Sequence, residues 1–299
     1  MSPFHGVLPA VITAIRDDTF DEPAFVALLE HLYRFPIDGL YVGGQTGEGL
    51  VLGMEARRRL TEAAIRHSPR GKAVIVHVGA MAVTDAIELA RHAAECGAQA
   101  VSSLPPAGPY SFGEVRRYYE ELAAASPLPL FVYHFTAYSP AVTSAQHLDE
   151  LCSIGNVAGL KFTDYDLFTL AHLKERGAVV YYGRDEMLAE GLLAGADGAI
   201  GTFYNVVPGL ATEIYRLARQ GEWEQARPLQ SRLRQLIRIC AQVPMLSAVK
   251  TILGWQGVPC GPCLAPRLNL TAAQESWLRE ALESAGLDRD LQLAVLPHR

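Results

Sequence analysis

The sequence predicts an α/β fold: a (β/α)8 TIM barrel over residues 1–220, followed by a helical C-terminal extension over residues 221–299. Short β-branched or apolar runs alternate with longer stretches of helical period, and eight such strand–helix units can be counted. Two junctions, Cys96-Gly-Ala-Gln and Ala194-Gly-Ala-Asp, nearly repeat one another, and each ends a helix with glycine. Eight repeats fit a closed barrel better than an open doubly wound sheet, which more often stops at about five to seven strands.

Each expected strand is a short apolar run, and an expected helix follows it. The strands are expected at 6–15, 39–43, 73–78, 100–104, 129–135, 157–162, 179–182 and 198–204. The helices are expected at 22–33, 54–67, 84–95, 112–125, 144–153, 167–176, 186–194 and 209–220. Ser111 followed by Glu114 is a capping-box pattern at the start of the fourth helix.

After Gln220 the pattern changes to helices only. They are expected at 223–239, 245–253 and 272–285, and Gly257-Val-Pro-Cys-Gly-Pro interrupts the chain between the last two. No low-complexity linker precedes this extension, so we expect it to pack on the barrel.

Composition and charge exclude several classes of function. The 299 residues are 49% hydrophobic and 19% charged, which is enough for a sizeable core. A net charge of -6 gives no basic face for nucleic acid or acidic lipid. The N-terminus lacks a signal-peptide pattern, and no uninterrupted apolar run is long enough to span a membrane. We therefore expect a cytoplasmic protein with neither nucleic-acid nor membrane partners.

The five cysteines, at 96, 152, 240, 260 and 263, are odd in number and scattered, which is not typical of a disulfide framework. Cys260-Gly-Pro-Cys263 has thioredoxin-like spacing, but it follows a predicted helix without a strand ahead of it. We interpret it as a loop. No second Cys pair or His pair completes a tetrahedral zinc set, so no metal is expected.

Polar residues follow several predicted strands, and in such a barrel the catalytic groups lie at the carboxyl ends of the strands. They gather at Gly43–Gly49, at Tyr133, at Lys161–Asp164, at Gly183–Glu186 and at Gly201–Asn205. These segments should therefore meet on one face of the barrel.

Lys161 lies inside an apolar run, Val157-Ala-Gly-Leu-Lys-Phe. Burial there disfavours the ammonium and leaves the neutral amine, the form that attacks a carbonyl carbon. Taken alone, a lysine at a strand end more often extends to solvent. Its place on the same face as the other polar segments favours a Schiff-base nucleophile.

The glycines of Gly43–Gly49 let backbone N–H groups approach a small anion, and Thr46 adds a hydroxyl donor. The spacing is neither that of a phosphate loop nor that of a dinucleotide-binding turn, so a carboxylate is the expected guest and a plain tight turn the alternative. Tyr133 either fills the core or moves protons beside the lysine, as carbinolamine formation and retro-aldol cleavage require. His134 should point to the other side of the strand, and we interpret both it and His77 as structural.

These residues, in this order, resemble the pyruvate-dependent class I aldolase family that includes N-acetylneuraminate lyase and dihydrodipicolinate synthase. The resemblance runs from Gly6 to about Pro266. It rests on Gly44-Gln-Thr-Gly-Glu48, Tyr133, Gly159-Leu-Lys161 and Gly198-Ala-Ile-Gly-Thr-Phe-Tyr-Asn205, and His77-Val-Gly, Gly-Leu-Lys-Phe-Thr-Asp and Gly183-Arg-Asp-Glu186 resemble the lyase branch most.

The resemblance implies a lyase that cleaves or forms a 2-keto-3-deoxy sugar acid, N-acetylneuraminate-like, from pyruvate and an aldehyde. Lys161 would form the imine with C2 of pyruvate, Tyr133 would relay protons at the C4 hydroxyl, and Thr46 would help to hold the pyruvate carboxylate. No metal or organic cofactor would be needed. The implied substrate-binding residues are Gly44, Gln45, Thr46, Thr163, Gly183, Asp185, Glu186 and Thr202.

The chain departs from the family pattern at positions that bear on specificity. Gln45 stands where Ser or Thr is usual, which affects the expected proton relay. Tyr138 replaces an arginine of the synthase branch, which argues against condensation with aspartate semialdehyde. The usual aromatic residue after the fourth strand is missing, although Tyr110 is nearby, and Arg184 replaces a common aromatic and favours an acidic substrate end. Tyr110, Tyr138 and Arg184 are therefore candidates for the tail pocket.

Two other functions stay open. One is a dihydrodipicolinate synthase-type condensation, or a keto-deoxy sugar acid dehydratase, on the same imine. The other is a non-catalytic 2-keto-acid sensor, which Gln45 favours and the presence of both Lys161 and Tyr133 opposes. Because the family is commonly tetrameric, we expect a homo-oligomer, either a tetramer or a dimer.

Overall fold

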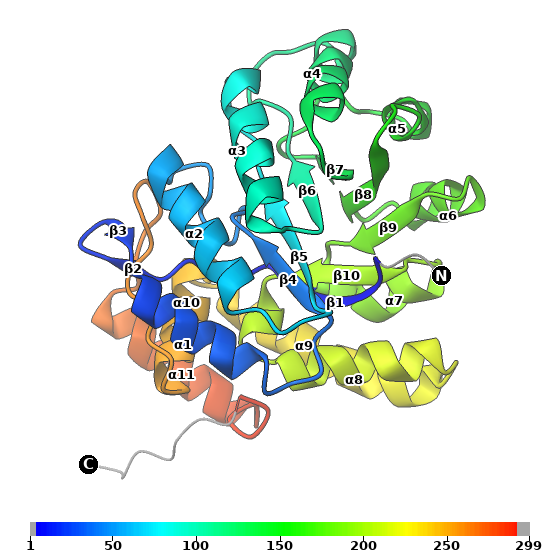
Figure 1. Cartoon of the computed structure of the whole chain (residues 1–299). Helices are drawn as coiled ribbons and strands as arrows, with labels where there is room; N and C mark the ends of the chain where they lie inside the picture. Colours follow the sequence, from blue (N-terminus) through cyan, green and yellow to red (C-terminus); the bar gives the residue numbers. More distant parts are fainter. Residues whose placement is uncertain (1–3, 292–299) are drawn as a thin grey trace.

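Eight parallel strands form a barrel in the computed structural model, which describes residues 4–291 (Figure 1). The strands are β1 (Gly6–Pro9), β4 (Gly39–Val42), β5 (Ala73–His77), β6 (Ala100–Ser103), β7 (Leu130–Phe135), β8 (Val157–Thr163), β9 (Val179–Tyr182) and β10 (Gly198–Gly201). They pair in the order β1-β10-β9-β8-β7-β6-β5-β4, and a bridge between Ala10 and Tyr41 joins the two ends. The predicted fold class is confirmed.

A helix follows each strand and covers the outside of the barrel (Figure 1). The helices are α1 (Glu22–Leu32), α2 (Met54–Arg66), α3 (Val83–Cys96), α4 (Phe112–Ala125), α5 (Ala145–Cys152), α6 (Leu167–Glu175), α7 (Leu188–Leu193) and α8 (Pro208–Arg219). The predicted capping box is present: the Ser111 hydroxyl accepts from the Glu114 N–H, and the Glu114 carboxylate accepts from Ser111. Such contacts satisfy backbone donors that the first turn leaves unpaired.

Three predicted elements were too long. The first strand ends at Pro9, and the chain then forms a small antiparallel hairpin, β2 (Ile15–Arg16) with β3 (Thr19–Phe20). The eighth strand ends at Gly201 and gives way to the 3-10 turn η2 (Phe203–Asn205). The seventh helix is divided into the turn η1 (Asp185–Met187) and α7. In the two strand regions the chain stays buried after it leaves the sheet, so the apolar pattern continues past the last pairing residue.

Side chains alternate between the inside of the barrel and the layer between strands and helices. The inner cluster is dominated by large side chains, among them Tyr41, Phe131, Tyr133 and Tyr181. The outer cluster is larger and joins the strands to the surrounding helices. Because the interior is filled, open space for a ligand is left at the ends of the strands.

The C-terminal extension contributes α9 (Trp223–Cys240), α10 (Met245–Trp255) and α11 (Ala272–Ser284), which pack into the outer cluster. Gln230 of α9 is fully buried; its side chain accepts from the Ala189 N–H and donates to the Asp185 carbonyl. The extension therefore contacts the turn that follows β9. Residues 1–3 at the start of the predicted barrel and residues 292–299 of the predicted extension lie outside the described residues.

Within residues 4–291, no single helix is long and apolar enough to cross a membrane, whereas α9 and α10 pass that test only as a pair bent by 112°. Cys260 and Cys263 lie in the loop between α10 and α11, with no strand ahead of them, as predicted.

Candidate active site

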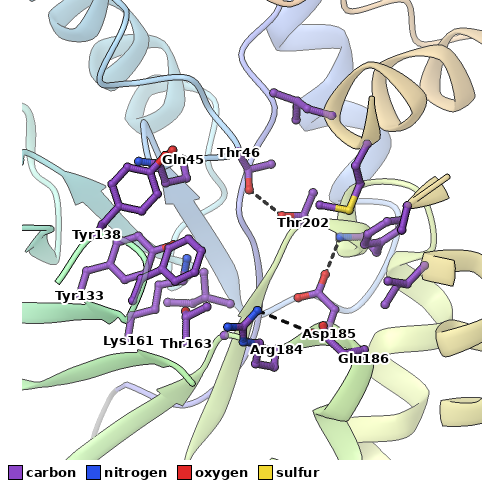
Figure 2. A pocket seen from close by; sticks show the side chains of 18 of the residues that line it. Gln45, Thr46, Tyr133, Tyr138, Lys161, Thr163, Arg184, Asp185, Glu186 and Thr202 are labelled. Carbon is purple, nitrogen blue, oxygen red and sulfur yellow. Dashed lines mark hydrogen bonds and ion pairs between the residues drawn. The ribbon is translucent and has the colours of Figure 1, made fainter. Parts of the chain in front are cut away.

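A cavity of about 560 Å³ opens at the carboxyl ends of the strands, between the barrel and the extension (Figure 2). The structure brings most of the predicted site residues together there: Gln45, Thr46, Tyr133, Tyr138, Lys161, Thr163, Gly183, Arg184, Asp185, Glu186 and Thr202 all line it. Gly44 lies beneath the lining in the β4 loop, where a side chain would collide with the Tyr41 ring. Tyr110 does not line the cavity; its loop runs outward from β6 and leaves the ring 38% exposed.

Lys161 on β8 is only 5% exposed, and its Nζ faces two aromatic rings. The Nζ lies 3.9 Å from the centroid of the Tyr133 ring and 4.6 Å from that of Tyr41. No carboxylate among the described residues lies within ion-pair distance of it. Burial lowers the pKa of Lys161 to about 7, and the charge of Asp185 opposes this shift in part. A large share of the amine is therefore neutral near pH 7.

Tyr133 on β7 is the direct neighbour of Lys161 in the parallel register. Its side chain is 3% exposed, and burial raises the pKa of its phenol well above the ordinary value. The hydroxyl therefore keeps its proton at neutral pH and can act as a donor. His134, the next residue, points to the other side of β7, where it stacks on Phe162 and lies 3.3 Å from the Asp164 carboxylate.

His77 is buried and links two loops, which agrees with its structural interpretation. The Leu104 N–H donates to its Nε2 at 3.1 Å, so Nδ1 carries the proton and donates to the Gly43 carbonyl at 3.1 Å. Burial and the nearby Arg57 lower the pKa of His77 well below its ordinary value. The neutral imidazole of His77 therefore stabilises the β4 loop through hydrogen bonds.

The β4 loop, Gly43–Gly49, has the tight backbone that its glycines predict. Gly43 adopts a left-handed φ of 70°, and a Cβ on Gly49 would lie 1.8 Å from the Gly43 carbonyl oxygen. Thr46 Oγ1 lies 2.7 Å from Thr202 Oγ1, which joins this loop to the end of β10 (Figure 2). The two hydroxyls contribute polar groups to the cavity lining.

Asp185 and Glu186 follow β9 and differ in their surroundings. Asp185 is 5% exposed, and its carboxylate accepts from the Phe203 N–H at 2.7 Å. Burial raises the pKa of Asp185 to about 7. Glu186 is more open and accepts a hydrogen bond from the Tyr165 hydroxyl at 2.6 Å. The charge of Asp185 therefore raises the pKa of Lys161, whereas Glu186 lies in the more open part of the lining.

Several lining residues were missed by the sequence analysis. Tyr165 follows Asp164 directly, and its aromatic type next to a predicted site segment was the available signal. Arg267 and the apolar wall from the extension had no local signal, because only the tertiary fold brings them to the cavity. That wall consists of Ile237, Ala241, Met245 and Leu246.

The cavity lining contains no histidine or cysteine. A group of potential metal ligands lies elsewhere, between α2 and α3, where Glu62, His92 and Cys96 have ligand atoms within 4.8 Å of one another. His92 Nε2 lies 3.0 Å from Glu62 Oε1. None of these three residues lines the cavity.

Comparisons with known proteins agree with this arrangement. A profile of the family described as "Dihydrodipicolinate synthetase family" matches residues 3–285. The chain is 38% identical over 284 residues to N-acetylneuraminate lyase from Rhizobium meliloti (strain 1021), which covers 93% of this chain and 94% of that protein. It is 32% identical over 268 residues to N-acetylneuraminate lyase from Enterobacter sp. (strain 638), covering 88% and 90% of the two chains.

Solved structures show the same architecture. The structure of CdNal from Clostridium difficile in complex with mannosamine has a TM-score of 0.89 and 26% identity, covering 94% of this chain and 98% of that one. A prophage protein of the dihydrodipicolinic acid synthase family from Escherichia coli K12, in complex with pyruvate, has a TM-score of 0.88 and 26% identity, covering 97% and 99%.

Proposed function

Because the chain belongs to the dihydrodipicolinate synthetase family, we propose that Lys161 forms the imine of a pyruvate-dependent class I aldolase. The protein is a Schiff-base lyase, and its named relatives favour a 2-keto-3-deoxy sugar acid, N-acetylneuraminate-like, as the substrate. The observation that carries the assignment of Lys161 is a buried amine without an ion partner at the bottom of the cavity.

Imine formation needs a neutral amine, a held carboxylate and a proton donor. The Lys161 Nζ attacks C2 of pyruvate, and the carbinolamine loses water to give the imine. The β4 loop and Thr46 suit the pyruvate carboxylate, because backbone N–H groups and a hydroxyl there can donate to it. Tyr133 supplies the proton with which the carbinolamine hydroxyl leaves as water.

Carbon–carbon bond formation then uses the imine as an electron sink. C3 loses a proton to give the enamine, C3 bonds to the aldehyde carbon, and the aldehyde oxygen takes up a proton to become the C4 hydroxyl. Water hydrolyses the imine and restores Lys161. In cleavage the same steps run backwards, and Tyr133 relays the proton from the C4 hydroxyl. Neither direction needs a metal or an organic cofactor.

The tail of the substrate would lie along the residues after β8 and β9. Thr163 Oγ1 is buried without a hydrogen bond of ordinary geometry in the described residues, yet it lies close enough to the Tyr133 hydroxyl to lower the pKa of that phenol in part, so it can contact either Tyr133 or a substrate hydroxyl. Glu186 can accept hydrogen bonds from hydroxyl groups, and Gly183 leaves room beside Thr163. A synthase or dehydratase reaction on the same imine is the alternative that the family also allows.

Incubation with pyruvate and borohydride, followed by intact mass measurement and peptide mapping, tests the proposal. We expect one pyruvate-derived adduct on Lys161 and none in Lys161→Ala. Absence of the adduct in folded protein with excess pyruvate would refute imine chemistry. Product analysis then separates the reactions: pyruvate release from a 2-keto-3-deoxy acid supports the lyase, whereas loss of water without pyruvate supports the dehydratase.

We also propose a cytoplasmic homo-oligomer, a tetramer or a dimer, from the resemblance to the family. Size-exclusion chromatography with light scattering tests the oligomeric state directly. A monomeric mass at micromolar concentration would contradict that proposal.

A further inference from the structure

Arg184 presents a guanidinium to the cavity in a fixed position. It follows Gly183 at the end of β9, and its side chain is 19% exposed. The guanidinium carbon lies 4.1 Å from the centroid of the Tyr165 ring and 5.5 Å from that of Phe135. Aromatic rings on two sides orient the guanidinium plane and leave its N–H edge free to donate.

The charge of Arg184 is incompletely matched by the protein. Its nearest carboxylate, that of Glu186, lies 3.8 Å away, beyond hydrogen-bond distance, and already accepts from the Tyr165 hydroxyl. The Nε of Arg184 is buried and has no hydrogen-bond partner in the described part of the chain. A mostly buried guanidinium in this state is costly, and an anion that accepts its N–H groups would lower the free energy.

The position of Arg184 is at the tail end of the proposed substrate. Tyr133 and Phe135 lie two residues apart on β7, roughly 7 Å along a strand, with their rings stacked. The Lys161 amine faces the Tyr133 ring, and Arg184 faces the Phe135 ring. Figure 2 shows Arg184 beside Glu186, on the far side of the cavity from Thr46. A short carbon chain that begins at the imine can therefore end at Arg184.

Arg267 adds a second cation to the cavity lining from the other side. Its Nη2 makes only long contacts with Gln45, 3.3 Å to the carbonyl oxygen and 3.5 Å to Oε1. Of the two acidic groups in the lining, Asp185 is directed to the Phe203 N–H and not to either arginine. Arg267 therefore lies on the Gln45 side of the cavity, and within the described residues the charge of Arg184 at the tail end is opposed by Glu186 at 3.8 Å and not by Asp185.

We propose that Arg184 binds an anionic group, a carboxylate or a phosphate, at the far end of the aldehyde half of the substrate. The inference rests on the proposed aldolase function; it keeps a 2-keto-3-deoxy acid as the substrate but requires a second acidic terminus, which N-acetylneuraminate itself lacks. A planar guanidinium suits such a group because two N–H bonds can form to two oxygens. The simplest example is the six-carbon diacid that pyruvate and tartronate semialdehyde would form by addition.

Matched aldehydes test the proposal on the wild-type protein. Glyceraldehyde, tartronate semialdehyde and glyceraldehyde 3-phosphate share three carbons and differ in a terminal hydroxyl, carboxylate or phosphate. Glucose and glucuronate form a longer pair, which covers a greater distance from the imine. We expect kcat/KM for addition to pyruvate to be at least on the order of tenfold higher for an anionic member than for its neutral counterpart. The preferred anion shows whether the site takes carboxylate or phosphate.

Three variants show which arginine causes the preference. Arg184→Gln should lower the ratio of anionic to neutral kcat/KM by about 10- to 100-fold, because charge-assisted hydrogen bonds are lost. Arg267→Gln removes the same charge from the more exposed position and should change that ratio by less than about threefold. Arg184→Lys keeps the charge without the planar pair of donors and should restore only part of the ratio.

The outcomes separate the two proposals. If the pyruvate adduct forms on Lys161 but the matched aldehydes react equally well, the acidic-terminus inference is wrong and the aldolase assignment stands. If the preference exists but follows Arg267 and not Arg184, the site has been assigned to the wrong residue. If no adduct forms in the wild type, the aldolase proposal itself fails.

Discussion

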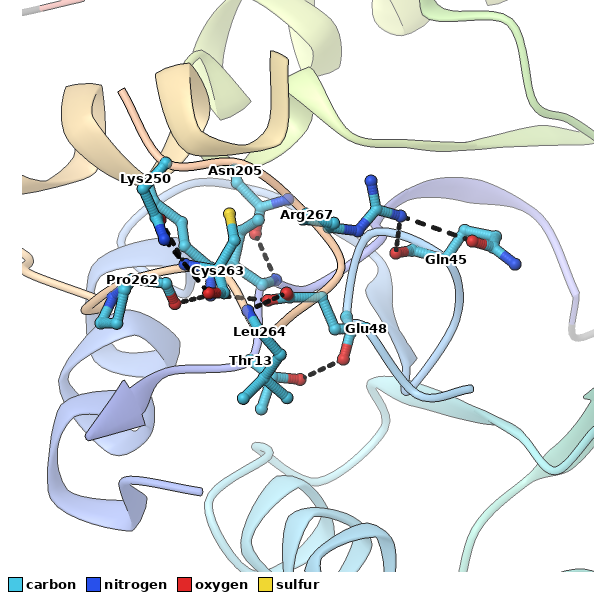
Figure 3. Close-up of polar contacts among 12 residues, drawn as sticks. Thr13, Gln45, Glu48, Asn205, Lys250, Pro262, Cys263, Leu264 and Arg267 are labelled. Atoms are coloured by element: carbon cyan, nitrogen blue, oxygen red, sulfur yellow. Dashed lines mark hydrogen bonds and ion pairs between the residues drawn. The ribbon is translucent and has the colours of Figure 1, made fainter. Parts of the chain in front are cut away.

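Lys161 and Lys250 are both almost completely buried, with 5% and 4% of their surface exposed. They differ in what surrounds the amine. Lys250 on α10 donates to the Glu48 carboxylate and to the Pro262 carbonyl, both at 2.6 Å (Figure 3). Lys161 faces two aromatic rings and has no carboxylate at ion-pair distance among the described residues.

The difference teaches what burial alone does to a lysine. A buried ammonium must be paired, or its pKa falls until the neutral amine is favoured. Lys250 is paired and joins the extension to the β4 loop, since Glu48 also accepts from the Leu264 N–H. Lys161 has no such partner among the described residues. Its burial therefore lowers the pKa and favours the neutral, nucleophilic amine. Lys250 thus stabilises the site, whereas the proposed function gives the chemistry to Lys161.

The largest expected effect comes from Lys161→Met, which keeps the length of the side chain and removes the amine. Turnover should fall by at least on the order of 10⁴-fold, because the covalent route is lost. The free energy of unfolding at pH 7 should rise by ~2–4 kcal/mol, because the wild-type protein must deprotonate or bury a charged lysine on folding. Activity assays and urea unfolding measure the two effects.

The stability gain has a defined pH dependence. Lys161 has a pKa of about 7 when folded and near 10.4 when unfolded, so the unfolded state binds more protons between these values. Wild-type stability therefore rises with pH across that window, and the advantage of Lys161→Met should shrink from pH 7 toward pH 10. An advantage that stays constant over this range would show that the amine is not the source of the cost.

Lys250→Met should have the opposite effect on stability. It leaves the Glu48 carboxylate buried without its cation, which costs ~3–5 kcal/mol. Adding Glu48→Gln should recover part of the loss, because the second variant removes the unpaired charge. Unfolding curves of the single and double variants give the coupling between the two residues.

In the Lys250→Met molecules that stay folded, pyruvate should still be trapped on Lys161. If Lys250→Met blocked trapping without destabilising the fold, the comparison between the two lysines would be wrong.

The two lysines also show how far the sequence could predict the site. Lys161 was identifiable because its apolar neighbours and its position near the carboxyl end of a predicted strand are both local in sequence. Lys250 was not, because its partner Glu48 is 202 residues away and a helical pattern does not indicate what a side chain meets. The same reason explains Arg267, which reaches the cavity only through the packing of the extension.

The barrel itself was predictable because each strand–helix unit repeats a local pattern. The ends of the first and eighth strands were not, since residues 10–14 and 203–205 stay buried and mostly apolar beyond the ends of the two strands. Tyr110 illustrates another limit: being next to the fourth strand in sequence did not bring it to the cavity.

Tyr133→Phe tests the hydroxyl of Tyr133. The ring of this residue lies beside the Lys161 amine, where Lys250 has a carboxylate. The ring beside the amine stays and the hydroxyl is lost, so trapping of pyruvate should persist while turnover slows by on the order of 100-fold. Single-turnover trapping and steady-state assays on the same preparation distinguish the two steps. Tyr181→Phe is a matched control, because that phenol donates to the His5 carbonyl and does not line the cavity. Turnover that is unchanged in Tyr133→Phe would remove the hydroxyl from the mechanism.

The smallest expected effect is a shift in a pH profile, and it tests the charge of Asp185, which opposes the effect of burial on the pKa of Lys161. The neutral amine is the reactive form, so the rate of trapping by pyruvate and cyanoborohydride should rise as pH increases through about 7 and then level off.

The carboxylate of Asp185 favours the ammonium and raises the pKa of Lys161. Asp185→Asn removes that charge, and its amide oxygen can still accept from the Phe203 N–H. The midpoint should therefore move to lower pH, and trapping near pH 7, where a large share of Asp185 is ionised, should be faster in the variant than in the wild type. Glu186→Gln is the control of opposite sign: Glu186 raises the pKa of Asp185, so removing its charge favours the Asp185 carboxylate and should not move the midpoint to lower pH. A midpoint that moves to higher pH in Asp185→Asn would mean that Asp185 helps to deprotonate the amine, and Lys161 would then resemble Lys250 in depending on a carboxylate.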